Sequence, residues 1–599
     1  METTHKRATE QPLRRLIGFK KGRQAAPHDL AAVRALLPHA VPTDTGALLP
    51  RDQLIEALHA INDHHQGLPE GRLVALAQLM KLPLAEVFEV ATFYHHFEVR
   101  PDAAPAPRLT VRVCESPACA MAGSAPLLAS LAKTLGAEVR LRSAPCIGRC
   151  EQAPAVQVGP FALPQATAAE VQAAVAALTD PAQVARVSQA GSGAGVAVLD
   201  QKALFRHIQK DFVAPEVVAY AAYRAAGGYG LAAAVVQGEM PGDEILAALD
   251  AAGLRGLGGA GFPSGRKWRI VREQAAPRLL AVNIDEGEPG TFKDRFYLER
   301  DPHRFLEGLL IAAQVVGCEA VYLYLRDEYA ECRALLQREL AALQAEPPCP
   351  LPRIELRRGA GAYICGEESA MIESLEGKRG EPRLRPPYIA ERGLFGRPTL
   401  EHNFETLYWV RDIVEQGAAA FAAPGRHGRK GLRSYSVSGR VRQPGVKRAP
   451  AGITLRELVD EYCGGMADGH TLYGFLPGGA SGGIFPAALA DVPLDFDTLQ
   501  PHGGFIGSAA VIVFSQHDRA RDLALNVMRF FEHESCGQCT PCRVGTAKAA
   551  ALMAAPVWDA TTLEDLSQVM ADASICGLGQ AAPNPVRCVL RYFPQEVSA

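Results

Sequence analysis

Three cysteines near the C-terminus, Cys536, Cys539 and Cys542, form a C-x2-C-x2-C pattern, and Cys576 follows in a separate segment. Three thiolates on one short loop can bind a single metal–sulfur core, and the fourth ligand then ties two distant parts of the chain together. Structural zinc sites more often use two separated cysteine pairs. The spacing therefore predicts a [4Fe–4S] cluster bound by these four cysteines, with zinc as the alternative.

A second group of four cysteines lies in the first third of the chain, in C-x4-C and C-x3-C spacing. The pattern predicts strands at 108–113, 138–142 and 155–159 and a helix from Ser124, so both pairs lie at strand–loop junctions of a small β-α-β unit. Four thiolates on neighbouring loops suit a [2Fe–2S] cluster, and a zinc site or plain buried cysteines are the alternatives. The predicted ligands are Cys114, Cys119, Cys146 and Cys150.

Composition limits the class of protein. A chain of 599 residues suggests about four modules of about 150 residues. The net charge of −3 gives no argument for nucleic-acid binding. No apolar run approaches the roughly 18–20 residues that span a bilayer, and the basic segment 1–24 lacks the apolar stretch of an export signal. We therefore expect a cytoplasmic protein, whose basic arm is a solvated tail or docks on a partner, and whose cysteines are thiolates and not disulfides.

A glycine-rich segment follows a predicted helix at 243–252. Gly256, Gly258 and Gly261 satisfy G-x-G-x-x-G, but a dinucleotide fingerprint should follow a strand. The loop is therefore predicted to bind a phosphate or an isoalloxazine ring outside the usual Rossmann geometry, with Lys267 adding charge.

The next stretch alternates strands (279–285, 320–325, 353–358) with helices (305–316, 329–345), which predicts a parallel α/β sheet covered on both faces. Polar loops follow the first and third strands, at 283–294 and 359–369. Ligands bind beyond the carboxyl ends of such strands. Cys365 and Cys588 are interpreted as packing residues.

The last third predicts a small β-grasp unit and a helical bundle. Strands at 435–439 and 509–514 flank a capping box, Thr454 to Glu457, and a glycine-rich loop at 476–484 that lacks the lysine of a P-loop. Helices at 523–532, 544–554 and 562–571 would surround the [4Fe–4S] cysteines.

Two resemblances narrow these predictions. Residues 89–97 and the two cysteine pairs after them resemble the thioredoxin-like [2Fe–2S] subunit of respiratory complex I. The three loops described above, with the cysteine run, resemble the FMN- and NADH-binding subunit of complex I and of soluble NAD-reducing diaphorases, over residues 230–595. Four histidines beside the first segment, His64, His65, His95 and His96, are interpreted as surface or interface residues and not as metal ligands.

The resemblance implies two sets of binding residues. FMN would be held by Gly256, Gly258, Lys267, Asn283, Asp285, Glu286, Gly366, Glu367 and Asn403. The NAD site would be shaped by Phe262, Glu288, Tyr363, Glu368, Arg385 and Tyr388. The chain departs from the family pattern at Leu257, in the Arg385–Tyr388 segment and at His402, which is not assigned a role.

The fold class expected is therefore α/β multidomain. The predicted order is a basic arm (1–30), a helical bundle (31–100), a thioredoxin-like [2Fe–2S] domain (105–180), a linker (181–214), a Rossmann-like FMN/NAD-binding domain (215–430), a β-grasp, SLBB-like domain (431–515) and a helical bundle with the [4Fe–4S] cluster (516–599).

The cofactors expected from the resemblance are FMN, NAD, [2Fe–2S] and [4Fe–4S]. A nicotinamide carries two electrons as hydride, iron–sulfur clusters carry one, and FMN does both, so no acid–base dyad or covalent nucleophile is needed and no catalytic residue is assigned. The fusion resembles the β subunit of NAD-dependent molybdenum or tungsten formate dehydrogenases. The resemblance lies in the amino-acid sequence of the glycine loop, residues 255–268, and in the presence of all four cysteines of the first group. The partner would then be an α subunit with Mo or W and further clusters. Alternatives are the diaphorase subunit of an NAD-reducing nickel–iron hydrogenase, a fused NADH-input subunit of complex I, and a non-enzymatic zinc scaffold.

Overall fold

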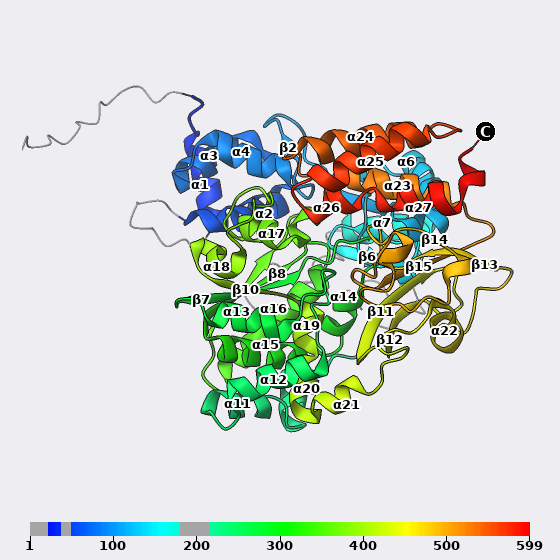
Figure 1. The fold of residues 1–599 in the computed structure, drawn as a ribbon. Helices are drawn as coiled ribbons and strands as arrows, with labels where there is room; N and C mark the ends of the chain where they lie inside the picture. The colour runs from blue at the N-terminus through cyan, green and yellow to red at the C-terminus, as the bar shows by residue number, and fades with distance from the viewer. Residues whose placement is uncertain (1–21, 38–48, 180–214, 599) are drawn as a thin grey trace, which may run out of the picture.

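The computed structural model describes residues 22–37, 49–179 and 215–598. Most of the predicted basic arm and all of the predicted linker lie outside these residues. Figure 1 shows helical bundles formed by both ends of the described chain at the top of the molecule, above a central α/β domain and a mixed sheet. None of the described helices is long and apolar enough to span a membrane.

The N-terminal bundle is helical, as predicted. It contains α1 (Pro27–Leu36), α2 (Leu54–His65), α3 (Glu70–Met80) and α4 (Leu84–Phe93), with short paired strands β1 (Leu68–Pro69) and β2 (Val99–Arg100). The last helix, α4, ends at Phe93, inside the segment 89–97. The reason is a contact between domains: the backbone N–H groups of His95 and His96 donate to Gly361 O (3.2 Å) and Ala360 O (3.0 Å) instead of continuing the helix.

The domain with the first cysteine group has the predicted β-α-β unit. Strand β3 is parallel to β4 and antiparallel to β5, in the sheet order β4-β3-β5-β6. A separate core of branched apolar side chains fills this domain. Its elements are β3 (Leu109–Cys114), α5 (Pro117–Met121), α6 (Ser124–Thr134), β4 (Val139–Ala144), β5 (Val156–Val158), β6 (Phe161–Leu163) and α7 (Ala168–Thr179).

The central domain is built on a four-stranded sheet, and all its strand pairs are parallel, as predicted. In the sheet order β10-β7-β8-β9, the chain passes from β7 through β8 to β9 at one edge. It then crosses back, so that β10 lies next to β7 at the other edge. Right-handed crossovers in opposite directions place helices on opposite faces, and α15 and α17 lie on opposite sides of the sheet in Figure 1. The carboxyl ends of β7 and β10 are therefore neighbours.

The central strands are β7 (Arg278–Ile284), β8 (Cys318–Leu325), β9 (Arg353–Arg358) and β10 (Thr399–Asn403). The helices are α10 (Tyr220–Ala225), α11 (Gly230–Gln237), α12 (Gly242–Ala252), α13 (Ser264–Arg272), α14 (Lys293–Leu298), α15 (Pro302–Val316), α16 (Ala330–Ala345), α17 (Glu368–Leu375), α18 (Ile389–Arg392), α19 (Phe404–Tyr408), α20 (Val410–Gln416) and α21 (Ala418–Ala422). The sequence did not predict β10, because this strand is short and most of its residues are polar.

The β-grasp domain has a five-stranded mixed sheet of order β12-β11-β15-β13-β14. The predicted capping box is present: Thr454 N donates to Glu457 Oε2 (2.8 Å), and Glu457 N donates to Thr454 Oγ1 (3.2 Å). The elements are β11 (Leu432–Gly439), β12 (Gly445–Pro450), α22 (Leu455–Glu457), β13 (Leu472–Leu476), β14 (Phe485–Pro486) and β15 (Ala510–Ser515).

The C-terminal bundle contains α23 (Ala520–Glu534), α24 (Thr540–Met553), α25 (Ala560–Ala573), α26 (Gly577–Ala581) and α27 (Asn584–Tyr592). Helix α24 begins four residues before the predicted start of 544, since Pro541 occupies a first-turn position where its missing N–H costs nothing. The second and third cysteines of the run therefore lie at the start of a helix.

Candidate cofactor sites

The glycine-rich loop follows a helix, as predicted, leads into the unpredicted helix α13, and folds back on itself. Gly256 N donates to Phe262 O (2.8 Å) between the end of α12 and the start of α13. A Cβ added to Gly258 would lie 3.0 Å from the Cβ of Asn403, the last residue of β10. Glycine at this position thus lets the loop approach the carboxyl ends of the parallel strands, where a ligand is expected.

Several of the predicted FMN residues meet at the end of β7. Asn283 Nδ2 donates to Gly366 O (2.9 Å), and Asp285 N donates to Asn283 Oδ1 (3.0 Å). Asp285 Oδ2 is buried and has no hydrogen-bond partner among the described residues, and burial raises the pKa of this carboxyl well above its usual range. Buried acceptors are normally satisfied, so this orphaned oxygen fits a ligand that supplies a donor, as an FMN ring would.

Lys267 lies between two carboxylates on the opposite side of the loop. Its Nζ is 2.8 Å from Glu401 Oε2 and 3.7 Å from Glu368 Oε2. Burial alone would lower the pKa of Lys267, but these two carboxylates reverse the effect and raise it. The ammonium group is therefore held charged, which suits an anionic ligand. Glu401 was not singled out from the sequence, because its strand was not predicted.

Three buried residues, Lys293, Asp294 and Glu405, and the partly buried Asn403 form one polar group next to the glycine loop. Lys293 Nζ is 2.8 Å from Asp294 Oδ1, 3.0 Å from Glu405 Oε2 and 3.3 Å from Asn403 Oδ1. Asn403 Nδ2 donates to Asp294 Oδ2 (2.7 Å). These contacts fix the predicted FMN residue Asn403. Lys293 and Asp294 lie in the predicted polar loop but were not assigned from the sequence. Their contacts with Asn403, which is distant in the chain, show that they hold this side chain in place.

The Glu286 side chain forms hydrogen bonds with other residues of the central domain. Its carboxylate accepts from Asp294 N (2.8 Å), Arg295 N (3.1 Å) and Tyr329 Oη (2.9 Å). Burial raises its pKa to about 7. Both oxygens of the Glu286 carboxylate thus already accept hydrogen bonds from groups of the central domain.

The predicted NAD residue Glu288 is held between two domains. Its Oε1 accepts from Ser481 N (2.8 Å), and its Oε2 bonds to the hydroxyl of Tyr363. Burial raises the pKa of Glu288. Ser481 belongs to the glycine-rich 476–484 loop, which the sequence analysis did not place at this site.

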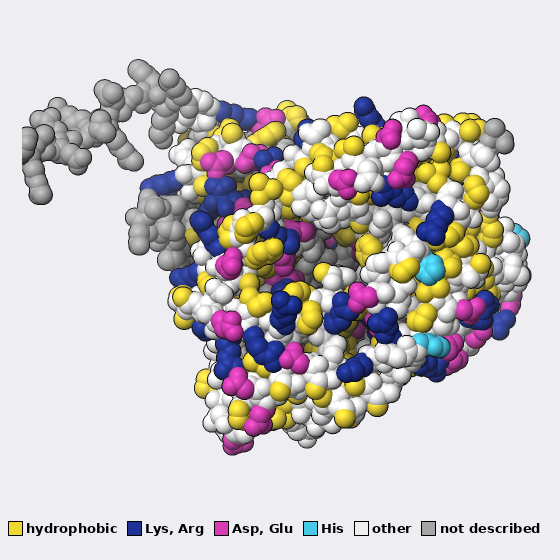
Figure 2. All heavy atoms as spheres, viewed as in Figure 1, with side chains coloured by type: hydrophobic (Ala, Val, Ile, Leu, Met, Phe, Trp, Pro, Cys, Tyr) yellow, Lys and Arg dark blue, Asp and Glu magenta, His cyan; other side chains and the backbone are white. Residues whose placement is uncertain are grey.

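The remaining predicted residues form a charged and aromatic rim. Arg385 pairs with Glu367 and with Glu368 (3.1 Å). Glu367 also caps α17 by accepting from Ser369 N and Ala370 N, each at 2.9 Å. The rings of Phe262 and Tyr388 are 40% and 54% exposed, so they are free to stack on a base. Figure 2 shows a hollow at the centre of this face of the molecule, with Lys and Arg side chains along its lower rim.

The four cysteines of the first group converge. All are buried and none is in a disulfide. Cys146 Sγ lies 3.7 Å from Cys150 Sγ, Ser116 Oγ is 3.4 Å from Cys114 Sγ and 3.8 Å from Cys150 Sγ, and Cys114 contacts both Cys119 and Cys146. Four sulfur atoms outside any disulfide in one place fit the ligand set of a [2Fe–2S] cluster.

The four C-terminal cysteines also come together. Cys539 and Cys576 are the N-cap residues of α24 and α26. A Cβ on Gly579 would lie only 2.9 Å from Cys542 Cβ, so glycine lets α26 approach α24 and bring Cys576 to the loop. Cys536, Cys539 and Cys576 are partly exposed, while Cys542 is buried. This set fits a [4Fe–4S] cluster whose fourth ligand comes from a distant segment.

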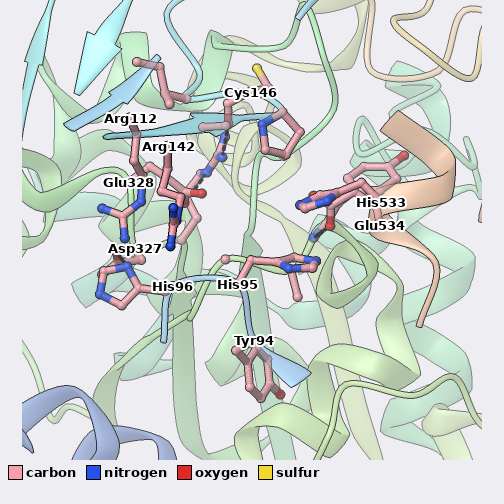
Figure 3. A pocket seen from close by; sticks show the side chains of 18 of the residues that line it. Tyr94, His95, His96, Arg112, Arg142, Cys146, Asp327, Glu328, His533 and Glu534 are labelled. Carbon is pink, nitrogen blue, oxygen red and sulfur yellow. Dashed lines mark hydrogen bonds and ion pairs between the residues drawn. The ribbon is translucent and has the colours of Figure 1, made fainter. Parts of the chain in front are cut away.

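A cavity of about 580 Å³ lies where four domains meet. Figure 3 shows Arg112 and Arg142 of the first cysteine domain on one side, with His95, His533 and Glu534 on the other. The rings of His95 and His533 stack at 4.0 Å, and burial lowers the pKa of His95 to about 4. His95 is therefore an interface residue, as predicted.

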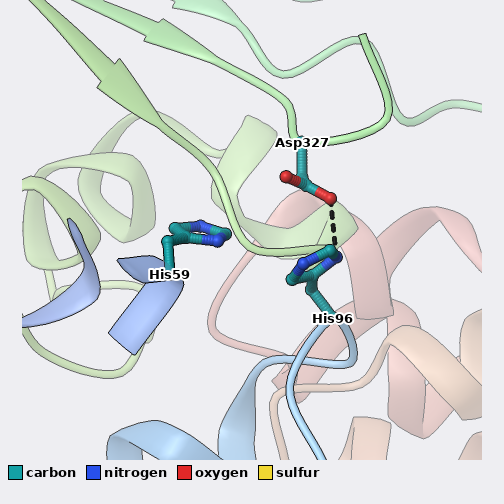
Figure 4. Close-up of side chains that lie close together, drawn as sticks. All are labelled: His59, His96 and Asp327. Atoms are coloured by element: carbon teal, nitrogen blue, oxygen red, sulfur yellow. Dashed lines mark ion pairs between the residues drawn. The ribbon is translucent and has the colours of Figure 1, made fainter. Parts of the chain in front are cut away.

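The neighbouring His96 is also an interface residue. Its Nδ1 is 2.6 Å from Asp327 Oδ2 (Figure 4). Asn62 Nδ2 lies 3.2 Å from its Nε2. His59, beside it, bonds through Nε2 to Gly359 O (2.9 Å). Asp327 is already paired with two arginines, so a metal ion would meet positive charge there, and the histidines instead join the N-terminal bundle to the central domain.

Comparison with protein families agrees with this arrangement. Four family models match: the thioredoxin-like [2Fe-2S] ferredoxin over residues 46–179, the Nuo51 FMN-binding domain over 249–412, the SLBB domain over 434–485, and the NADH-ubiquinone oxidoreductase-F iron-sulfur binding region over 522–599.

Individual proteins are similar over long stretches. An NADH-quinone oxidoreductase subunit of Rhizobium meliloti is 42% identical over 392 residues, which are 63% of this chain and 93% of the relative. The mitochondrial NADH dehydrogenase [ubiquinone] flavoprotein 1 of Dictyostelium discoideum is 41% identical, over 59% of this chain and 78% of the relative. A chain from the crystal structure of NAD+-reducing [NiFe]-hydrogenase in the H2-reduced state matches 91% of this chain and 93% of its own length, with a TM-score of 0.77 and 33% identity.

The matches confirm the predicted fold class and the predicted cofactors, and they confirm the flavoprotein resemblance at the level of the family. They do not separate one type of complex from another. The chain belongs to the family of NADH oxidoreductase subunits that combine an FMN- and NADH-binding domain with [2Fe–2S] and [4Fe–4S] domains.

Proposed function

We propose that this chain is the diaphorase subunit of a larger complex, which passes electrons between NAD(H) and a partner subunit through FMN and both clusters. One observation carries the proposal: the predicted flavin site stands between the two cysteine groups. The 285–292 loop begins at the orphaned Asp285 carboxylate and ends at Phe292, which packs against Cys146 and Cys150. On the other side, Tyr363 N donates to Glu534 Oε2 (2.8 Å), at the end of the helix that leads to Cys536.

Different residues would bind different parts of FMN. Gly256, Gly258 and Lys267 suit the phosphate end of FMN, and Asn283, Asp285, Gly366 and Asn403 suit its ring. When bound, FMN exchanges two electrons with a nicotinamide and single electrons with iron–sulfur clusters. Glu288, fixed by Ser481 and Tyr363, would accept a hydrogen bond from the nucleotide and orient it.

We propose a formate-oxidising molybdenum or tungsten subunit as the partner. The support is the form of the glycine loop and the complete first cysteine set, whose four sulfurs converge. An NAD-reducing hydrogenase is the second candidate, because a hydrogenase chain matches 91% of this chain, including the fusion of both cysteine domains. A complex I role is supported by the relatives named as NADH-quinone oxidoreductase and NADH dehydrogenase, which match 63% and 59% of this chain.

The native complex, purified with its partner, tests these candidates. NAD+ reduction would be followed after addition of formate or of hydrogen. We expect formate to drive NADH formation and hydrogen to fail. Activity with hydrogen alone would replace the partner assignment but keep the diaphorase function, whereas a protein with zinc and no flavin absorbance would overturn both.

A further inference from the structure

One arginine connects the predicted flavin loop to the predicted [2Fe–2S] ligands. Arg326 follows β8, and its side chain is 4% exposed. Its Nη2 donates to the backbone carbonyl of Cys146 (2.8 Å), and its Nη1 donates to the backbone carbonyl of Glu286. Its Nε pairs with Glu328 Oε2 (3.0 Å). The guanidinium plane thus holds the two loops in one fixed relation, which the shape of arginine makes possible.

Other side chains of the central domain hold the same cysteine loop. Arg295 Nε donates to Gly148 O (3.0 Å). Gly148 has a φ of +72°, and an added Cβ would collide with Tyr329 Oη. The loop therefore packs closely against the central domain. Arg149 of the loop reaches back to Glu331 (3.0 Å). The surroundings of Cys146 and Cys150 are therefore completed by side chains of the central domain that lie more than a hundred residues later in the chain.

With a [2Fe–2S] cluster bound to these cysteines, the charge of Arg326 would act on the equilibrium between its oxidised and reduced forms. Reduction adds one negative charge at the cysteine sulfurs and their metal core. A cation removed from water interacts with that charge far more strongly than a solvated one. Hydrogen bonding and burial around the ligands are known levers on cluster potentials. Arg326 therefore favours the reduced cluster, and the adjacent Glu328 carboxylate partly offsets this effect.

We propose that Arg326 is a positioning residue that sets the reduction potential of the [2Fe–2S] cluster and links its ligand loop to the flavin loop. The inference rests on the proposed function, because it takes Cys146 as a cluster ligand. It predicts a redox change that is independent of NAD(H) turnover.

Redox titration of the full-length protein, followed by the EPR signal of the reduced [2Fe–2S] cluster, tests the proposal. We expect Arg326→Gln to lower the ratio of reduced to oxidised cluster at a given potential at least tenfold, which is about 59 mV for one electron. Glu328→Gln leaves the arginine in place and should shift the equilibrium in the opposite direction. Arg326→Lys keeps the charge but not the fork, so its potential should lie nearer the wild type.

Arg333→Gln is the matched control. Arg333 lies in the same domain and is partly buried, but it pairs with Asp327 Oδ1 (3.4 Å) and not with the cysteine loop. An equal shift in this variant, or unchanged potentials in both Arg326→Gln and Glu328→Gln with the cluster bound, would overturn the role of Arg326. If Arg326→Gln does not retain iron, the opposite shift in Glu328→Gln still decides. Absence of iron, sulfide and flavin from the wild-type protein would instead remove the proposed function.

Discussion

At the scale of one residue, His402 gives the clearest pH dependence. Its Nε2 accepts from Trp268 Nε1 (2.7 Å), and burial lowers its pKa well below 6.5. Below pH 6.5 the unfolded chain binds a proton that the folded chain excludes, so stability falls as the pH falls, by up to about 1.4 kcal/mol per pH unit. His402→Asn keeps an acceptor for Trp268 without titrating. We expect its thermal midpoint to fall less than that of the wild type between pH 7.5 and 5.5.

His517→Asn makes the same exchange at an exposed ring and controls for the substitution itself. If the thermal midpoints of wild type and His402→Asn changed equally with pH, His402 would not take up a proton on unfolding.

Single residues also show how far the sequence could lead. Spacing alone identified both cysteine groups, because a metal–sulfur core fixes the number and separation of its ligands. Lys293, Glu401 and Ser481 could not be found in this way. Each is defined by a partner far along the chain, such as Glu405 for Lys293 or Glu288 for Ser481. No local pattern records such a contact.

At the scale of an element, the loop between β13 and β14 tests the assignment of Glu288. Gly479 has a φ of +71°, and an added Cβ would lie 2.6 Å from Glu288 Cγ. Gly479→Ala should raise the KM for NADH about tenfold, equivalent to about 1.4 kcal/mol, because it displaces the carboxylate. Steady-state NADH oxidation with an artificial acceptor measures this.

Gly469→Ala separates backbone strain from the clash. Gly469 has a φ of +78° and no described atom within 4 Å of an added Cβ. Both variants should lose about 1–2 kcal/mol of stability from the left-handed backbone, but only Gly479→Ala should change KM. A rise in KM for both variants would dissociate the effect from Glu288.

Elements with a strong period were predicted well. The helices α23, α24 and α25 and the strands β7, β8 and β9 lie within a few residues of expectation, since burial of one face imposes the pattern. Strand β10 was missed because its buried positions carry polar residues, including Glu401 and His402.

At the scale of the whole molecule, Cys576 joins α26 to the cysteine run across the C-terminal bundle. Cys576→Ala should remove the iron of the [4Fe–4S] cluster, lower the thermal midpoint and block electron transfer to the partner. Cys588→Ala is the control, because Cys588 is a buried cysteine that bonds only weakly, to Gly503 O (3.6 Å). Iron analysis with EPR distinguishes them. Full iron content in Cys576→Ala would exclude it as a ligand.

The order of the domains followed from the sequence, but the way they meet did not. Contacts such as His96 with Asp327, or Arg326 with Cys146, join segments that are separated by more than 150 residues. Their partners are ordinary charged residues, which composition and periodicity assign to the surface. The interfaces therefore had to come from the folded structure.

The dependence of the Cys146–Cys150 loop on Arg326 has a consequence for biosynthesis. Cys146 leaves the ribosome 180 residues before Arg326 does. At about 5–20 residues per second, this delay is about 10–40 s. During that interval the Cys146–Cys150 loop lacks its contact with Arg326. We therefore expect iron to enter this site after the central domain has been translated.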